Sequence, residues 1–225
     1  MRKGIIFDLD GTLWDSAAQI VDGWNIAFEK HGYEPVASIA KLKALMGLPM
    51  EDIMEALIPN LPAKERDSIL KKCCEEEEKL LLLNGGILYP NLVECLEQLM
   101  AKGYHLYIVS NCQSGYIETF LSFHCLWDYF DDKECPGDSN MLKAENIRLI
   151  IERNNLDTAI YVGDIRKDYI ASAKANVPFI LANYGFGNND VPESAGIIND
   201  LSELPELADA INASIQAGEA FPHNS

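Results

Sequence analysis

Hydrophobic and polar positions change their spacing along the chain, and these changes predict alternating strands and helices. Short apolar runs, typical of buried parallel strands, occupy 3–7, 105–109, 159–162, 177–181 and, more weakly, 196–198. Helical spacing of apolar residues covers 91–102, 114–123, 143–154, 167–176 and 201–215. A further short strand is expected to begin at 129–131. The pattern predicts an α/β fold, a parallel sheet with helices on both faces.

The stretch from residue 15 to residue 83 departs from this alternation, because it contains helical patterns only. These cover 16–31, 38–46, 50–58 and 63–82, with prolines between several of them. We therefore expect a core of residues 1–14 and 84–225, and a small all-helical cap domain of residues 15–83 inserted after the first strand. Within the cap, the loop 47–49 is expected to lie over the site, and the glutamate run 75–78 to form a solvated helix face. The end of the chain, 217–225, is expected to fray.

Polar groups follow three of the predicted strands directly. Asp8 and Asp10 follow the first strand, Ser110 and Asn111 the strand at 105–109, and Asp164 the strand at 159–162. Ligands of open parallel sheets bind beyond the carboxyl ends of the strands, which lie along one edge. The sequence therefore predicts that these side chains share one site.

The first of these groups has the spacing of a catalytic carboxylate pair. Asp8 and Asp10 lie two residues apart on extended backbone, so they face the same side. Gly11 permits a sharp turn, and Thr12 offers a hydroxyl and a backbone donor to a phosphoryl group. One carboxylate can attack phosphorus, while the other protonates the leaving oxygen and later deprotonates water. An isolated pair would equally suit a simple metal site or a turn, but its place after a buried strand favours catalysis.

Charge neutralisation at such a site is assigned to Lys143. Its ammonium group would offset the attacking carboxylate and the phosphoryl oxygens, although an ordinary surface lysine is the alternative. Lys133 and Lys167 are its competitors along the sequence. Ser110, which could instead be a helix cap or turn residue, and Asn111 are assigned to phosphate binding.

A magnesium ion completes the predicted site. Mg²⁺ prefers oxygen ligands and keeps several waters, so Asp8, the backbone carbonyl of Asp10, and Asp164 would form the protein's share of its coordination. Asp168 is expected to support the site, by binding a metal water or by holding Lys143. The alternative for Asp168 is a favourable charge at a helix N-terminus.

Composition narrows the possible partners. The formal net charge of −17 repels nucleic acid and anionic lipid, and no apolar run is long enough to cross a membrane. Six cysteines without metal-ligand spacing, and no signal peptide, predict reduced thiols and a cytoplasmic location. So acidic a chain needs local positive charge to handle phosphate, which the metal and Lys143 would supply.

These motifs together resemble those of the haloacid dehalogenase-like hydrolases. The run Phe7-Asp8-Leu9-Asp10-Gly11-Thr12-Leu13 is similar to the family's first motif. Ser110-Asn111, Lys143 and Gly163-Asp164 with Asp168 follow in the family order. The cap position is similar to that of the phosphoglycolate phosphatase and beta-phosphoglucomutase branch. The resemblance implies a Rossmann-like core, a phosphoaspartate on Asp8, Asp10 as acid and base, Mg²⁺ as cofactor, and a small phosphorylated metabolite as substrate.

Several alternatives remain open within this resemblance. A phosphosugar mutase would use the same nucleophile, and a non-catalytic binding or regulatory protein could keep the fold. Phosphonate-cleaving relatives use a cap lysine, for which Lys41 and Lys43 are the candidates, while true dehalogenases lack the aspartate that Asp10 provides. A monomer and a homodimer are equally compatible with the sequence.

Overall fold

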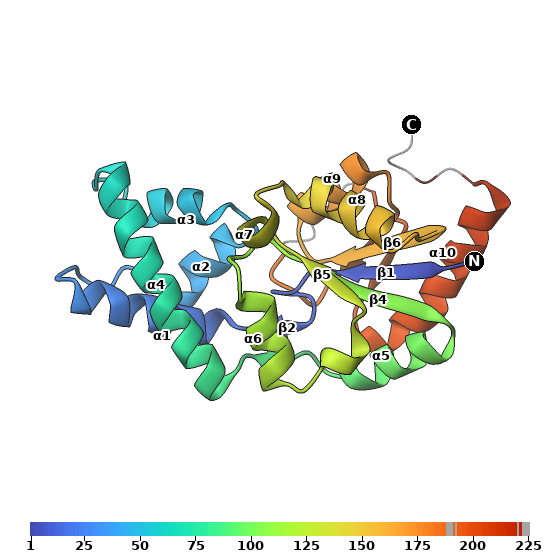
Figure 1. Ribbon diagram of the computed structural model, residues 1–225, viewed down its shortest axis with the longest axis horizontal. Coiled ribbons are helices and arrows are strands. Elements are labelled where there is room, and N and C mark those ends of the chain that lie inside the picture. Colours follow the sequence, from blue (N-terminus) through green and yellow to red (C-terminus); the bar gives the residue numbers. More distant parts are fainter. Residues whose placement is uncertain (188–190, 192, 220, 222–225) are drawn as a thin grey trace.

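A six-stranded sheet forms the centre of the computed structural model, which describes residues 1–187, 191, 193–219 and 221 (Figure 1). The strand order is β5-β4-β1-β6-β7-β8, and all neighbouring strands are parallel. The strands are β1 (Lys3–Phe7), β4 (Tyr104–Val109), β5 (Asp132–Glu134), β6 (Thr158–Gly163), β7 (Phe179–Ala182) and β8 (Gly196–Ile198). The predicted α/β class is confirmed.

Helices cover both faces of this sheet. They are α5 (Leu92–Ala101), α6 (Tyr116–Phe123), α8 (Lys143–Arg153), α9 (Arg166–Ala175) and α10 (Leu204–Ala217). Side chains alternate along β1, so that Ile6 packs on the face covered by α8 and α9, while Ile5 and Phe7 pack on the opposite face. Figure 1 shows α8 and α9 on one side of the strands and α5 and α10 on the other. Burial on both faces explains why strands β1, β4, β6 and β7 appear in the sequence as continuous apolar runs.

Four helices, α1 (Ala17–Lys30), α2 (Ile39–Leu45), α3 (Met50–Leu57) and α4 (Ala63–Asn84), follow the first strand. They gather beyond the carboxyl ends of the sheet strands (Figure 1). Helices α1 and α4 approach closely at Gly23, where an added Cβ would lie 2.8 Å from the backbone nitrogen of Glu77. The helical content of this stretch agrees with the sequence pattern, and its division from the core as a separate domain stays a prediction.

The two segments that join these helices to the sheet pair with each other. Strand β2 (Trp14–Asp15) runs antiparallel to β3 (Ile87–Leu88), with Trp14 opposite Leu88. Neither strand was predicted, because two residues are too few to show a period. The short helix α7 (Pro136–Ser139) and the 3₁₀ turns Trp127–Tyr129 and Leu201–Glu203 were also not predicted.

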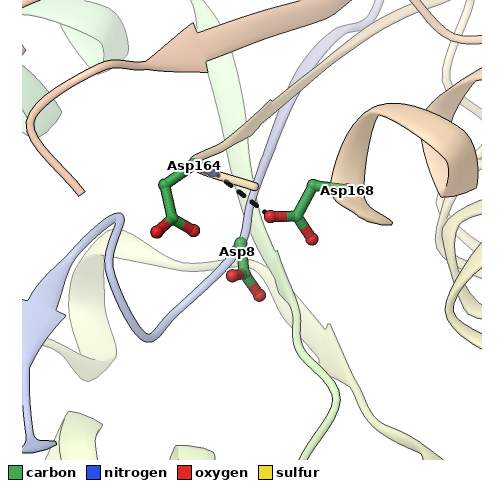
Figure 2. Close-up of side chains that lie close together, drawn as sticks. All are labelled: Asp8, Asp164 and Asp168. Carbon is green, nitrogen blue, oxygen red and sulfur yellow. Dashed lines mark hydrogen bonds between the residues drawn. The ribbon is translucent and has the colours of Figure 1, made fainter. Parts of the chain in front are cut away.

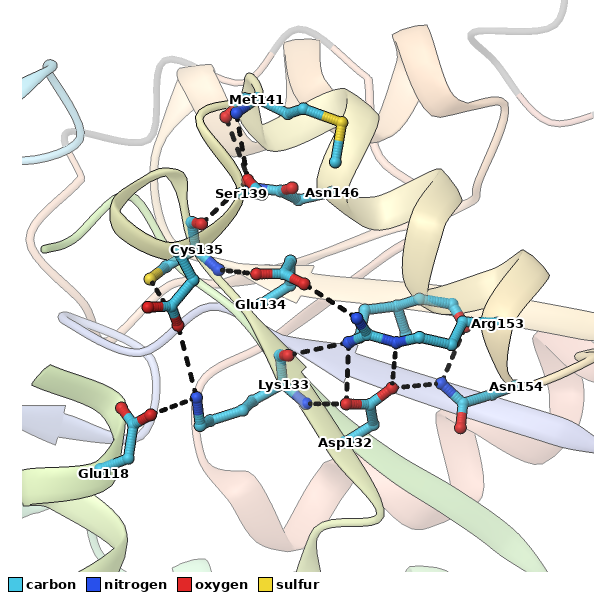
Figure 3. A network of polar contacts seen from close by, with 12 residues as sticks. Glu118, Asp132, Lys133, Glu134, Cys135, Ser139, Met141, Asn146, Arg153 and Asn154 are labelled. Atoms are coloured by element: carbon cyan, nitrogen blue, oxygen red, sulfur yellow. Dashed lines mark hydrogen bonds and ion pairs between the residues drawn. The ribbon is translucent and has the colours of Figure 1, made fainter. Parts of the chain in front are cut away.

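The edge strand β5 lies later than predicted. Residues 127–129 form a 3₁₀ turn, and the strand begins at Asp132 rather than at 129–131. Arg153 of α8 holds this polar strand by donating to Asp132, to Glu134 and to the carbonyl of Lys133 (Figure 3). A strand held by charged side chains has no apolar run that could mark its position.

The remaining predictions about the chain have mixed outcomes. All six cysteines are free thiols. Across the described residues no helix combines the length and apolarity needed to cross a membrane. Helix α10 continues to Ala217, and the expected fraying at 217–225 falls largely outside the described residues.

Candidate active site

Three neighbouring strands bring the predicted polar residues to one edge of the sheet. Strand β1 lies between β4 and β6, so Asp8 at its end is flanked by Ser110 and Asp164. The backbone N–H of Asp8 donates to the carbonyl of Val162 at 2.8 Å, which continues the ladder to the site. Figure 2 shows the carboxylates of Asp8, Asp164 and Asp168 close together. The strand-end prediction therefore locates these side chains correctly.

Lys143, the first residue of α8, connects two of these carboxylates. Its buried Nζ donates to Asp8 Oδ1 at 2.7 Å and to Asp168 Oδ1 at 2.6 Å. The other oxygen of Asp168 accepts the backbone N–H groups of Asp164 and Ile165, both at 3.2 Å. Asp168 thus lies at the N-terminus of α9 and holds Lys143, so both interpretations of this residue have a geometric basis.

The competing lysines lie elsewhere. Lys133 pairs with Glu118 at 2.5 Å (Figure 3) and with Asp138 at 3.5 Å. Lys167 is exposed. Among the described residues, Lys143 is the lysine that lines a cavity together with Asp8. The geometry therefore favours Lys143 as the cation beside Asp8.

The two cap lysines considered for phosphonate chemistry have other partners. Lys43 pairs with Asp15 at 2.6 Å, and Lys41 donates to the carbonyl of Val36 at 3.3 Å. Neither lines the cavity that contains Asp8.

Asp10 has neutral hydrogen-bond donors that the sequence did not reveal. Its Oδ1 accepts from Trp14 Nε1 at 2.9 Å, Ser16 Oγ at 2.5 Å and Tyr116 OH at 2.8 Å. Serine directly before a predicted helix is expected to cap it, but the Ser16 side chain makes no capping hydrogen bond to α1, so this expectation from the sequence is wrong. The Ser16 hydroxyl donates to Asp10 at the site instead. Tyr116 carried no sequence signal.

Burial sets the protonation behaviour of the two catalytic candidates. It raises the pKa of Asp8 to about 7, with the Asp168 charge adding to the shift and Lys143 opposing it. Burial also raises the pKa of Asp10, against the hydrogen bonds from Ser16, Tyr116 and Trp14. Asp10 is therefore suited to hold a proton, whereas Asp8 needs positive charge beside it to stay ionised.

A cation would fit between Asp8 and Asp164. Carboxylate oxygens of Asp8, Asp164 and Asp168 lie within 4.8 Å of one another. Asp164 Oδ2 accepts the backbone N–H of Phe186 at 2.7 Å, but its Oδ1 is buried without a hydrogen-bond partner. A buried carboxylate oxygen left without a donor is unfavourable, and it is a natural ligand for a hard cation. Both oxygens of Asp168 already have partners, which leaves Asp8 and Asp164 as the ligands that fit.

Gly11 allows the loop after β1 to lie against Asp164. Its φ is +84°, and an added Cβ would lie 2.1 Å from Asp164 Oδ2. Only glycine has both the backbone freedom and the missing side chain that this approach requires.

The phosphate-binding candidates divide into two groups. Ser110 and Asn111 line the cavity, and Asn111 Nδ2 donates at 3.3 Å to the carbonyl of Gly47, in the loop expected over the site. Gly47 and Leu48 also line the cavity. Thr12 is buried, its Oγ1 has no hydrogen-bond partner, and it is not among the lining residues. The structure therefore does not bring the Thr12 hydroxyl to the cavity.

The cavity itself is small, with a volume of about 40 Å³. One wall carries the strand-end residues Asp8, Asp10 and Ser110, and the opposite wall is formed mainly by apolar side chains of α1–α3. This arrangement places two carboxylates, one ammonium group and one hydroxyl around a single cavity, which is a suitable environment for a phosphoryl group.

Comparisons with known proteins identify the family of this chain. The family profile described as haloacid dehalogenase-like hydrolase matches residues 5–182. The phosphoglycolate phosphatase of Escherichia coli (strain K12) is 26% identical over 252 aligned residues, covering 99% of this chain and 94% of the relative. That of Rhodobacter capsulatus is 25% identical, with 93% and 98% covered.

Solved structures show the same relationship. A Bacteroides fragilis protein assigned to the haloacid dehalogenase-like hydrolases superposes with a TM-score of 0.80 at 26% identity, covering 91% of this chain and 100% of the other. The chain belongs to the haloacid dehalogenase-like hydrolases. Within that family it is an enzyme of the phosphatase class.

Proposed function

We propose that this enzyme hydrolyses a small phosphomonoester through a phosphoaspartate formed on Asp8. The observation that carries the proposal is the meeting of Asp8, Asp10, Lys143 and Asp164 around one cavity at the carboxyl ends of the strands. Each has the chemistry that phosphoryl transfer requires: a nucleophile, an acid and base, a cation and a metal ligand. The family membership agrees with this assignment.

In the proposed reaction the two aspartates divide the work. Asp8, paired with Lys143, attacks phosphorus, while Asp10 gives its proton to the oxygen of the departing alcohol. Asp10 then takes a proton from water, which attacks the phosphoaspartate and releases phosphate. Lys143, Ser110 and the Asn111 amide stabilise the phosphoryl oxygens. The raised pKa of Asp10 supports its part as the acid.

Mg²⁺ is the proposed cofactor, as is general for phosphatases of this family. Asp8, Asp164 and the backbone carbonyl of Asp10 would hold it, and the orphaned Asp164 Oδ1 supports this ligand set. When bound, it neutralises the carboxylates and the phosphoryl charge.

The helices α1–α4 are proposed to act as a cap, residues 15–83, over a core of residues 1–14 and 84–225. The apolar side chains that they contribute to the cavity would exclude water other than the attacking molecule. The curated relatives carry the name phosphoglycolate phosphatase, which supports a small soluble phosphomonoester as substrate. The free cysteines suit a reducing compartment, and we place the enzyme in the cytoplasm.

Phosphate release from p-nitrophenyl phosphate tests the proposal. The purified enzyme with Mg²⁺ should release phosphate, and chelation by EDTA should stop it until Mg²⁺ is restored. Glucose 1-phosphate in the same assay should yield free phosphate rather than glucose 6-phosphate, which separates a hydrolase from a mutase. An enzyme that binds Mg²⁺ but hydrolyses no phosphomonoester across a metabolite panel would contradict the proposal.

A further inference from the structure

One residue of the glutamate run 75–78 does not face solvent. Glu77 of α4 is only 2% exposed, whereas Glu75 and Glu78 are exposed. The expected solvated face therefore holds for Glu75 and Glu78, while Glu76 is half-buried, and the expectation is wrong for Glu77. Burying an ionised carboxylate costs free energy unless the group is paired and hydrogen-bonded, so the partners of Glu77 determine what this burial means.

The partners of Glu77 are both neutral. Trp24 Nε1 of α1 donates to its Oε2 at 2.5 Å, and Gln113 Nε2 donates to its Oε1 at 2.9 Å. Among the described residues no lysine or arginine pairs with Glu77, and burial raises the pKa of its carboxyl group to about 7. The carboxyl group is thus held in place by neutral donors, and above about pH 7 it carries a charge that no lysine or arginine partner compensates.

Glu77 lines the same cavity as the catalytic aspartates. Its charge is close enough to Asp10 for that carboxylate to add to the pKa shift of Glu77. Because Asp10 is the proposed donor to the departing oxygen, the alcohol portion of the substrate lies on this side of the phosphoryl group. Among the described lining residues Lys143 is the single lysine or arginine, and its ammonium group already pairs with Asp8 and Asp168.

A second, larger cavity beside the first has the same sign of charge. Its volume is about 700 Å³, and it shares Asn111, Gln113 and Lys143 with the catalytic cavity. Its described lining carries Glu51, Glu75 and Glu78, against Lys71 as its one further lysine. The glutamates of this lining outnumber its lysines by three to two, so a substrate that extends into this space meets a small excess of negative charge.

We propose that Glu77 selects a phosphomonoester whose alcohol portion carries a protonated amine, and that it disfavours one that carries a carboxylate. This inference rests on the proposed function. An ammonium group near Glu77 would form a charge-assisted hydrogen bond, whereas a carboxylate would meet a like charge in a water-poor cavity. The apolar wall formed by Ile20, Leu42 and Ile53 suits the short carbon chain between the two ends of such a substrate. The compound for which the relatives are named would then be a poor substrate here.

Three esters of equal length test the inference, because they differ only in the terminal group. They are O-phosphoethanolamine, 2-hydroxyethyl phosphate and 2-phosphoglycolate, assayed for phosphate release with Mg²⁺. We expect kcat/KM to fall in that order, with about tenfold or more between the ammonium and carboxylate esters, because like charges repel. A kcat/KM for 2-phosphoglycolate equal to or above that for O-phosphoethanolamine would overturn the inference.

The variant Glu77→Gln identifies the residue responsible. It keeps the size of the side chain and removes the charge, so the ratio between the ammonium and carboxylate esters should fall by about tenfold. Glu76→Gln is the matched control, because Glu76 pairs with Lys30 and Lys79 outside the cavity, and its ratio should stay at the wild-type value. An unchanged ratio in Glu77→Gln would overturn the assignment.

The same series of esters distinguishes a failure of the proposed selectivity from a failure of the proposed phosphatase function. Phosphate release from 2-hydroxyethyl phosphate with no preference between the charged esters would refute the selectivity alone. Absence of release from every ester, p-nitrophenyl phosphate included, would refute the phosphatase function and the selectivity with it.

Discussion

At the scale of single residues, Asp8 and Asp10 have the same chemistry but different partners. Asp8 accepts a hydrogen bond from the ammonium group of Lys143, whereas Asp10 accepts hydrogen bonds from neutral donors, one indole and two hydroxyls. A cation favours the ionised carboxylate more strongly than neutral donors do. This difference in partners explains how two aspartates at one strand end can act as a nucleophile and as an acid.

Asp10→Asn should lower the turnover of p-nitrophenyl phosphate by about 100- to 10,000-fold, the usual contribution of general acid–base catalysis. The amide cannot donate a proton to the leaving oxygen or accept one from water. Steady-state assays, with Mg²⁺ binding measured by calorimetry, check this. Metal binding should persist because the proposed metal contact is the backbone carbonyl, and unchanged turnover would remove Asp10 from its proposed role.

Tyr116→Phe should shift the alkaline limb of the pH–rate profile to higher pH. The Tyr116 hydroxyl lowers the pKa of Asp10 by stabilising its ionised form, so its loss raises that pKa. Asp10 then keeps its catalytic proton to a higher pH. The measurement is kcat/KM against pH, with Tyr104→Phe as the control, because Tyr104 donates to Asp209 away from the site. A shift to lower pH would contradict the assignment of Asp10 as acid.

At the scale of elements, the predictions succeeded where burial gives a segment a regular pattern of apolar residues. Strands buried on both faces and amphipathic helices have regular patterns, so β1, β4 and β6 and the site residues at their ends could be located from sequence. Strands β2 and β3 are too short for a pattern, and β5 is held by the charged side chain of Arg153.

Contacts between distant segments could not be read from the chain. Tyr116 reaches Asp10 across 106 positions, and Gln113 reaches Glu77 across 36. No local spacing encodes either pair, because each depends on how α6 and α4 pack around the site. The glutamate run similarly hides one buried member, since local polarity is the same at all four positions.

Glu77→Gln should change the pH dependence of folding stability. Burial raises the pKa of Glu77 from its ordinary value of 4.5 to about 7, so the folded protein binds this proton more tightly than the unfolded chain. The resulting stabilisation is complete below about pH 4.5 and is lost as the pH rises through about 7. The variant has no such proton to lose. Between pH 5 and pH 8 its free energy of unfolding should therefore rise relative to that of the wild type by up to about 3 kcal/mol.

Urea unfolding at the two pH values measures this difference. Glu76→Gln serves as the control, because ion pairs with Lys30 and Lys79 lower the pKa of Glu76 to about 2. The stabilisation that Glu76 provides is lost only as the pH falls below about 4.5 toward 2, so it changes little between pH 5 and pH 8. If the free energy of unfolding of the wild type rose relative to that of Glu77→Gln between pH 5 and pH 8, the raised pKa of the buried Glu77 would be contradicted.

At the scale of the whole molecule, a chain with a formal net charge of −17 gathers three buried aspartates at the edge of its sheet. One lysine offsets part of this charge, and the remainder favours a divalent cation. Helices α1–α4 lie beyond the same edge (Figure 1), and apolar side chains of α1–α3 line the cavity there. The metal and this cover together would turn an acidic surface into a site for a phosphate ester.

Mg²⁺ should therefore raise the melting temperature of the wild-type protein, because a ligand that binds only the folded state stabilises it. Asp164→Asn should remove most of this shift, since it replaces the carboxylate whose oxygen lacks a partner. Thermal scans with Mg²⁺ and with EDTA give both values. Asp209→Asn is the control, because Asp209 pairs with Lys102 far from the metal ligands. An equal Mg²⁺-dependent shift in Asp164→Asn would refute this ligand.

The role of Asp8 as nucleophile is tested most directly by phosphate release in Asp8→Asn, compared with the wild type at saturating Mg²⁺ and p-nitrophenyl phosphate. The two side chains have nearly the same shape, so circular dichroism should show an unchanged fold. Because the amide cannot form the phosphoaspartate, release should fall to the background of the uncatalysed reaction. Phosphate release by Asp8→Asn at a rate near that of the wild type would contradict the proposed mechanism.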